Sequence, residues 1–336
     1  MPAPLLPALR RAAPHRPLTW FSLAMAGLAV VSAAGLVADD RVLVGAPVWL
    51  KPLKFSLSFV LYGLTLAWLL GRSPARSRTG WWAGTVVAAT GTAEMAVIVG
   101  QAVRGRRSHF NLATPLDAAL FQAMGATIVV LWLATLVIAL LQFRRGRGAD
   151  PAATWAVRLG VLIALAGLAL GGLMLAPTPD QQAAAAHGVR DVLGAHSVGV
   201  PDGGPGMPLT GWSTTGGDLR IPHFVGMHAL QLLPLFLLGL DVLGRRIPRL
   251  RAGRTRLGLV LVAAGFLTGL LALVTWQALR GQPLIRPDAA TLGALAALLA
   301  ATALGAYAAL RAPARPGDAP TDTTAPPPAT PRELTA

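Results

Sequence analysis

The segment GDLRIPHFVGMHALQ, residues 217–231, carries two histidines and a glutamine where a polar stretch runs into an apolar helix. The whole chain has only six histidines. His228 lies about 9 Å along the helix from Pro222, at 1.5 Å per residue, and Gln231 follows on the same helical face. An imidazole can serve as a general acid, a general base or a metal ligand. His223 and His228 are therefore candidate catalytic residues, and Gln231 is a candidate ligand-binding neighbour.

Glu94 is the only ionisable side chain inside the third long apolar run of the chain. It lies about 15 Å before Arg104, where that run ends, which places it near the middle of a hydrocarbon layer about 30 Å thick. A charged carboxylate facing lipid there is strongly unfavourable, so Glu94 must point into protein, either paired or protonated. Gln101 continues the same face outward. We predict Glu94 and Gln101 as catalytic residues; the alternative is a protonated carboxyl that only bonds to a neighbouring helix.

More polar side chains cluster on the side from which these residues enter the apolar layer. Five of the six histidines fall there, namely His109, His187, His196, His223 and His228. Positive charge is disfavoured on the outer side of a membrane protein, so lysines and arginines there indicate an anionic partner such as a phosphate, a carboxylate or the aspartates of the long loop itself. The alternative is that they snorkel to lipid headgroups. The predicted ligand-binding residues are Lys54, Arg104, His109, Asp117, Asp218, Arg220 and Gln231.

A metal site is a further interpretation of the histidines. Histidine near carboxylate can bind zinc or another divalent ion, and the candidate ligands are His109, His223 and His228. Five residues turn a regular helix by about 140°, so His223 and His228 cannot easily share one ion. No HExxH motif is present. The identity of any cofactor, a divalent metal or haem, stays open, and scattered loop histidines are the simpler alternative.

The elements that must position these residues are membrane helices. The chain has 336 residues, of which 54% are hydrophobic and 13% charged, against about 25% charged in a soluble domain. Apolar runs of about 20 residues are long enough to cross a bilayer. We predict an all-α, polytopic membrane helix bundle with eight spans: 18–38, 52–71, 81–103, 116–142, 155–176, 222–243, 257–279 and 288–310. The absence of cysteine excludes disulfides, thiolate metal sites and cysteine nucleophiles.

The distribution of positive charge predicts the orientation of these spans. Of the 29 basic residues, 19 fall on one side and 10 on the other, so both termini are expected in the cytoplasm and the long loop 177–221 outside. The net charge of +15 is therefore a topology signal rather than a nucleic-acid footprint. The first span, about 21 residues long, exceeds a signal-peptide core and is kept as a helix. The tails 1–17 and 311–336 are cytoplasmic, and the second is rich in Pro and Thr and expected to be disordered.

Two stretches of the chain resemble one another and indicate an internal duplication. VIVGQAVRG ends the third span and ALVTWQALRG ends the seventh, which aligns Gln101 with Gln277 and Arg104 with Arg280. PLDAAL and PDAATL then open the next spans. The predicted halves are 18–142 and 155–310, and four spans each make the repeat parallel, with a site at the interface of the halves. Chance matching of Ala- and Leu-rich helices is the alternative.

Eight spans in two four-helix halves resemble the layout of the haem A synthases. That family places histidines on paired helices of both halves, whereas the second, fourth and eighth spans here have none. We therefore assign no family. The expected function is that of a membrane enzyme, for example in a bacterial inner membrane, acting on a lipid-linked or quinone-like substrate by His/Glu acid–base or metal or haem chemistry. The alternatives are a proton-coupled transporter and a non-catalytic lipid-binding or assembly protein. The expected partners are the lipid bilayer and an anionic or lipid-linked small molecule, and no nucleic acid is expected.

Overall fold

The computed structural model describes residues 15–71, 77–144 and 150–312. Most of the two predicted tails, 1–17 and 311–336, lies outside the described residues. Seven helical segments are long and apolar enough to cross a membrane, and a bent pair of helices makes an eighth candidate. The prediction of a polytopic, all-α membrane protein is confirmed. The helices are α2 (Arg16–Ala38), α3 (Leu50–Gly71), α4 (Arg78–Val103), α5 (Pro115–Arg144), α6 (Pro151–Leu170), α8 (Arg220–Met227), α9 (Ala229–Leu243), α10 (Gly253–Leu279) and α11 (Ala289–Arg311).

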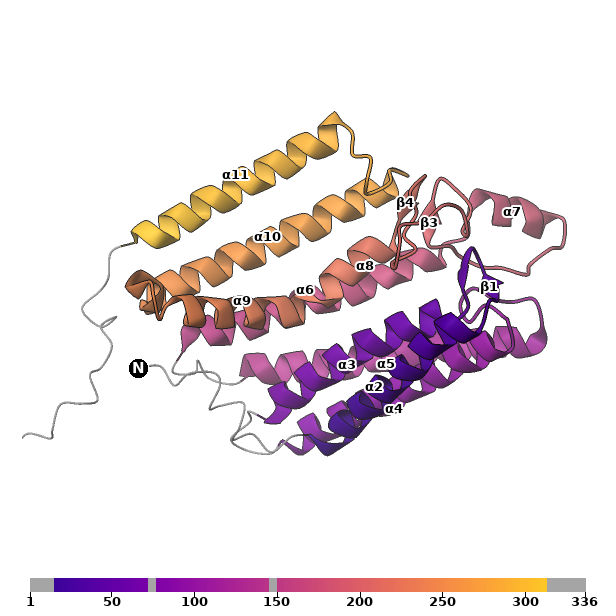
Figure 1. The fold of residues 1–336 in the computed structure, drawn as a ribbon, viewed down its shortest axis with the longest axis horizontal. Coiled ribbons are helices and arrows are strands. Elements are labelled where there is room, and N and C mark those ends of the chain that lie inside the picture. The colour runs from indigo at the N-terminus through magenta and orange to yellow at the C-terminus, as the bar shows by residue number, and fades with distance from the viewer. Residues whose placement is uncertain (1–14, 72–76, 145–149, 313–336) are drawn as a thin grey trace, which may run out of the picture.

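The helices pack in two groups that follow the order of the chain. In the first, α2 packs on α3 and α4 on α5, while α3 also contacts α4; in the second, α6 packs on α8, α9 and α10. The groups meet where α5 contacts α6 and α3 contacts α9 (Figure 1). The last helix, α11, packs mainly on α10, and only 6% of its most apolar stretch is buried. Most of its surface is therefore left for lipid.

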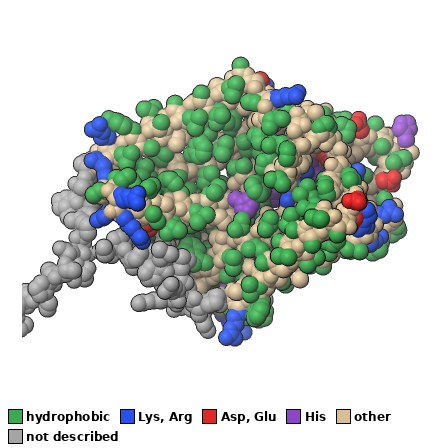
Figure 2. All heavy atoms as spheres, in the orientation of Figure 1, with side chains coloured by type: hydrophobic (Ala, Val, Ile, Leu, Met, Phe, Trp, Pro, Cys, Tyr) green, Lys and Arg blue, Asp and Glu red, His purple; other side chains and the backbone are tan. Residues whose placement is uncertain are grey.

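The surface of the bundle has the distribution expected of a membrane protein. Hydrophobic side chains cover the length of the helices, and charged side chains gather at the two ends (Figure 2). Large apolar side chains such as Trp20, Val30 and Leu304 are about 70% exposed. Such surface is unfavourable in water and favourable in hydrocarbon. Which end faces the cytoplasm stays a prediction.

The sixth span is broken, whereas the sequence pattern suggests one run over 222–243. Helices α8 and α9 meet at His228 at an angle of 46°. Pro234 lacks the N–H that would bond to the carbonyl of Leu230, which weakens the first turns of α9. On the other side of the break, Gly226 lies so close to Gly167 of α6 that an added Cβ would be 2.4 Å from the Gly167 Cα. His228 thus lies at a break between two helices, where the sequence placed it inside a regular one.

The long loop of the second half covers the same end of both halves. It contains η1 (Gly171–Leu175), α7 (Pro179–Ala186) and the strands β3 (Ser197–Val198) and β4 (Gly217–Asp218), which pair antiparallel. The loop reaches the first half through two backbone hydrogen bonds, in which Leu112 donates to the Asp191 carbonyl and Leu193 to the Phe110 carbonyl. The hairpin β1 (Val42–Leu43) and β2 (Ala46–Pro47) lies against it at Gly203. The loop and the hairpin together cover one end of the bundle. We call the loop, residues 171–219, the outer segment.

Candidate functional site

Both lysines of the chain lie in the first two turns of α3, half-buried beneath the outer segment. The Lys51 Nζ is 3.0 Å from Nδ1 of His109 and lies over the Phe55 ring. The Lys54 Nζ donates to the carbonyl of Thr210 at 2.6 Å. Among the ion pairs of the described residues, none includes a lysine. Two lysine side chains without an ion-pair partner therefore lie three residues apart at the start of α3.

Three imidazoles lie near one another at this end of the bundle, and His109 and His196 are close enough to Lys51 for its charge to act on them. Burial, the Lys51 charge and the proximity of His196 and His223 hold the pKa of His109 well below its ordinary value. Burial also lowers the pKa of His196, although its hydrogen bond to Asp202 opposes that shift. The His223 Nδ1 lies 2.9 Å from the Gly167 carbonyl, which orients the ring. Neutral imidazoles next to lysines make this a set of hydrogen-bonding and proton-accepting groups around positive charge.

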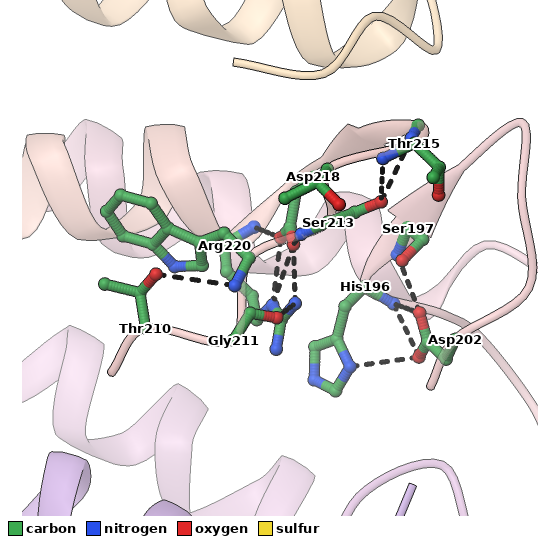
Figure 3. A network of polar contacts seen from close by, with 12 residues as sticks. His196, Ser197, Asp202, Thr210, Gly211, Ser213, Thr215, Asp218 and Arg220 are labelled. Atoms are coloured by element: carbon green, nitrogen blue, oxygen red, sulfur yellow. Dashed lines mark hydrogen bonds and ion pairs between the residues drawn. The ribbon is translucent and has the colours of Figure 1, made fainter. Parts of the chain in front are cut away.

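Two carboxylates of the outer segment, Asp202 and Asp218, bond to groups within that segment (Figure 3). Asp218 is buried, accepts a hydrogen bond from the Ser213 N–H at 2.8 Å and pairs with Arg220 at 2.5 Å. Arg220 also donates to the Gly211 carbonyl. Burial would raise the pKa of Asp202, but hydrogen bonds from the His196 ring and from the His196 and Ser197 N–H groups hold it below its usual range. These two aspartates hold the loop in shape, and their charges act on Lys51 and Lys54 without forming an ion pair with either.

Glu94 points into the first half, as the energetic argument requires. It is 3% exposed, and the Thr127 hydroxyl of α5 donates to its Oε1 at 2.6 Å. The Lys51 ammonium is close enough for its charge to act on the carboxyl. The carboxyl thus lies below the lysines, within the first four helices.

Gln101, Arg104 and Asp117 are joined to one another at the outer end of α4 and α5. Asp117 is fully buried, and its Oδ1 accepts from the Gln101 amide at 2.8 Å and from Arg104 at 2.9 Å. Thr114 donates to the other carboxylate oxygen. The sequence proposes Gln101 as catalytic and the other two as ligand-binding. The structure holds all three in one network that ties the end of α4 to the start of α5.

His228 and Gln231 form a polar pair at the break between α8 and α9. The His228 Nε2 and both polar side-chain atoms of Gln231 are buried without a well-formed hydrogen bond, although the two side chains interact with each other. The His228 ring stands edge-on to Phe224 at 4.4 Å, and Phe224 stands edge-on to Trp212 of the outer segment at 5.6 Å. Buried polar atoms normally find partners, so the unsatisfied atoms keep this pair a candidate binding point.

The structure offers no arrangement for a metal that resembles the predicted one. Among the residues that the structure describes, no group of three or more His, Asp or Glu side chains lies close enough to hold an ion. His109 and His223 are near each other, but their Nδ1 atoms lie against Lys51 and the Gly167 carbonyl.

Compared with known protein families, curated proteins and solved structures, the chain has no significant match.

Some residues around the site are absent from the predicted set. Lys51, His196 and Thr127 were not proposed, because loop spacing does not reveal which helix end a side chain reaches. A signal for Lys51 did exist: the chain has only two lysines, and they are three residues apart at one helix start. Thr127 had none, since a threonine in an apolar helix usually bonds to its own backbone.

Proposed function

We propose that this protein binds an anionic, lipid-linked molecule at an outward-facing site between its two halves and carries out acid–base chemistry on it. The observation that supports this most is the pair of half-buried lysines without a carboxylate within 4 Å. Burying an unpaired charge is costly, and an incoming anion removes that cost. A phosphate or carboxylate could accept hydrogen bonds from both ammonium groups.

The surrounding side chains suit proton transfer at the bound group. An imidazole within hydrogen-bonding reach of a substrate can act as a general base; His109 contacts Lys51 directly, and His223 lies near His109. His228 and Gln231 supply further donors and acceptors on α8 and α9. Glu94, deeper in the first half, is a proton reservoir whose charge Lys51 can influence. Binding of the anion and acid–base chemistry therefore involve different side chains, which permits separate tests.

The proposal is tested by lipid binding to the detergent-solubilised chain. We expect Lys51→Gln and Lys54→Gln each to weaken binding of phosphatidylglycerol about tenfold, because each removes one charge-assisted hydrogen bond. Arg41→Gln is the matched control, since Arg41 is an outer-end cation already paired with Asp39. Phosphatidylcholine, which carries no net charge, should bind weakly to all forms. Equal binding of the two lipids, or no effect of either lysine variant, contradicts the proposal.

We also propose that the site faces away from the cytoplasm, with both termini inside. A cysteine at position 187, in the exposed part of the outer segment, should react with a membrane-impermeant thiol reagent only from outside. A cysteine at exposed position 246 should react only from inside. Labelling of position 187 from the cytoplasmic side contradicts the orientation.

A further inference from the structure

One face of the broken helix pair links the cationic end of the site to the interior of the membrane. Arg220, Phe224, His228 and Leu232 follow at intervals of four residues, so they lie on one helical face. The ring contacts between Phe224 and His228, and the backbone hydrogen bond from Leu232 to His228, continue this face across the break. Phe224 and Leu232 are more than 40% exposed. At Phe224 and Leu232 the face is therefore open sideways, whereas the His228 Nε2 between them is buried.

An apolar groove begins one turn below His228. It has a volume of about 520 Å³ and lies between α9, α10 and α11, with Leu232, Phe236, Val262, Leu267, Thr302 and Ala306 among its walls. Thr302 is the only polar residue that lines it, and its hydroxyl donates to the backbone of its own helix. The volume is in the usual range for ligand sites. The groove exists because α11 packs mainly on α10 and leaves space beside α9.

We propose that the groove holds the hydrocarbon chain of the same molecule whose anionic group binds Lys51 and Lys54. This inference rests on the proposed function and adds to it the substrate class, an anionic amphiphile that enters sideways from the bilayer. From the outer end inward, this face presents Arg220, an aromatic ring, a polar pair with unsatisfied atoms and then hydrocarbon. Arg220 is paired with Asp218, and Lys54 of α3 reaches the same end, because it donates to the Thr210 carbonyl next to the Gly211 carbonyl that Arg220 contacts. That order matches a lipid with an anionic end, a polar linkage and a chain. Figure 2 shows histidine and basic side chains within the apolar face between the halves.

The order of groups also assigns a task to His228 and Gln231. With the anionic end at the lysines and the chain in the groove, the linkage between head and chain lies beside the unsatisfied atoms of this pair. A carbonyl or hydroxyl oxygen of the linkage would satisfy them. A small water-soluble anion would occupy only the lysines. Chain length should therefore affect affinity through the groove alone.

The experiment compares a groove residue with its lipid-facing neighbour. Leu232→Trp fills the groove, whereas Leu235→Trp adds the same bulk at an exposed position of α9 outside it. Val262→Trp and Leu261→Trp are the corresponding pair on α10. The full chain is titrated with dioleoyl-phosphatidylglycerol and with dihexanoyl-phosphatidylglycerol. We expect the groove variants to weaken the long-chain lipid about tenfold and to leave the short-chain lipid unchanged, because each buried methylene contributes to binding.

The outcomes separate this inference from the proposed function. If Lys54→Gln weakens both lipids but the groove variants weaken neither, the headgroup site stands and the groove assignment is wrong. If the groove variants weaken dioleoyl-phosphatidylcholine as much as the anionic lipid, and Lys54→Gln has no effect on either, the groove holds ordinary membrane lipid only. That result overturns both proposals. The two variant pairs guard against misfolding, since a folding defect in one would not be repeated in the other with the same chain-length dependence.

Discussion

In the first half, α2 and α3 are joined by residues 39–49, whereas in the second half α6 and α8 are joined by residues 171–219. The first connection is a short hairpin; the second contains α7, β3 and β4 and extends over both halves. The helix after the short connection, α3, is unbroken, and the helix after the long one is split at His228. The additional chain and the break both lie at the candidate site.

Elsewhere the halves are alike in detail. Helices α4 and α10 each end at an arginine followed by a glycine with positive φ, +65° at Gly105 and +71° at Gly281. In both, the glycine N–H bonds to the carbonyl three residues earlier, and the next N–H bonds to the carbonyl of the glutamine, Gln101 or Gln277. Arg104 then pairs with Asp117, and Arg280 with Asp288. This likeness supports the duplication as a proposal, and it teaches that the shared elements make the scaffold while the differences make the site.

The largest expected difference in stability is between the two helix pairs that these connections join, α6 with α8 and α2 with α3. In α8, an added Cβ at Gly226 would lie 2.4 Å from the Gly167 backbone, so Gly226→Ala forces α6 and α8 apart. In α3, an added Cβ at Gly63 would meet the Ser22 hydroxyl, which can rotate away. We expect Gly226→Ala to destabilise by about 3 kcal/mol and Gly63→Ala by about 1 kcal/mol or less. Thermal unfolding in detergent measures both; equal losses would contradict the close packing at Gly226.

Replacing the aspartate of each arginine–aspartate pair should also change the free energy of unfolding, and the two losses should differ by a smaller amount. Asp117 is fully buried with three side-chain partners, whereas the Asp288 side chain is 38% exposed and caps α11 through the Thr291 N–H. Asp117→Ala leaves buried donors unpaired and should cost about 2–3 kcal/mol. Asp288→Ala removes a helix cap and a surface pair and should cost about 1 kcal/mol. The same unfolding measurement ranks them, and a larger loss for Asp288→Ala would refute the assignment.

Two buried histidines should also introduce a pH dependence, His109 between α4 and α5 and His196 in the extended connection of the second half. Since the folded protein lowers the pKa of His109 and His196, the unfolded chain binds more protons as the pH falls below about 6.5. Their contribution to stability is therefore present above that pH and lost below it. The unfolding temperature should fall between pH 8 and pH 5, less steeply in His196→Asn and unchanged in slope in the exposed His187→Asn control. Identical slopes in the two variants would exclude His196 as a source.

Much of the scaffold could be predicted from the sequence, because membrane spans follow from hydrophobicity and length. The span boundaries agree with the helices to within a few residues, for example 81–103 within Arg78–Val103. The break at His228 was not predicted, because it depends on how closely Gly226 approaches Gly167, two residues far apart in the chain. Periodicity on a single helix contains no information of that kind.

The candidate site could be predicted less completely, for a related reason. The cost of placing a polar side chain in lipid identifies Glu94 and His228 individually from the sequence, and Glu94 is buried as expected. The partners of polar residues depend instead on the loops. Asp218 and Arg220 pair with each other, and Gln101 is occupied by Asp117, so residues that look alike in the sequence have different tasks. The lysines are distinguished by their lack of an ion-pair partner among the described residues, which the sequence does not reveal.

The smallest expected effect on stability, and the most informative on function, comes from Glu94→Gln. The Thr127 hydroxyl donates to Oε1 of Glu94, and an amide oxygen can accept the same hydrogen bond, so the unfolding temperature should change little. The second half has no acidic residue within α10 or α11, so this carboxyl is particular to the first half. If Glu94 exchanges a proton with the site, Glu94→Gln should abolish turnover of the bound anionic lipid while leaving its affinity within about twofold, since the lysines are unchanged. Thr127→Val is the matched control, because it removes the hydrogen bond but keeps the carboxyl. A Glu94→Gln variant with full activity would show that the carboxyl serves only to join α4 to α5.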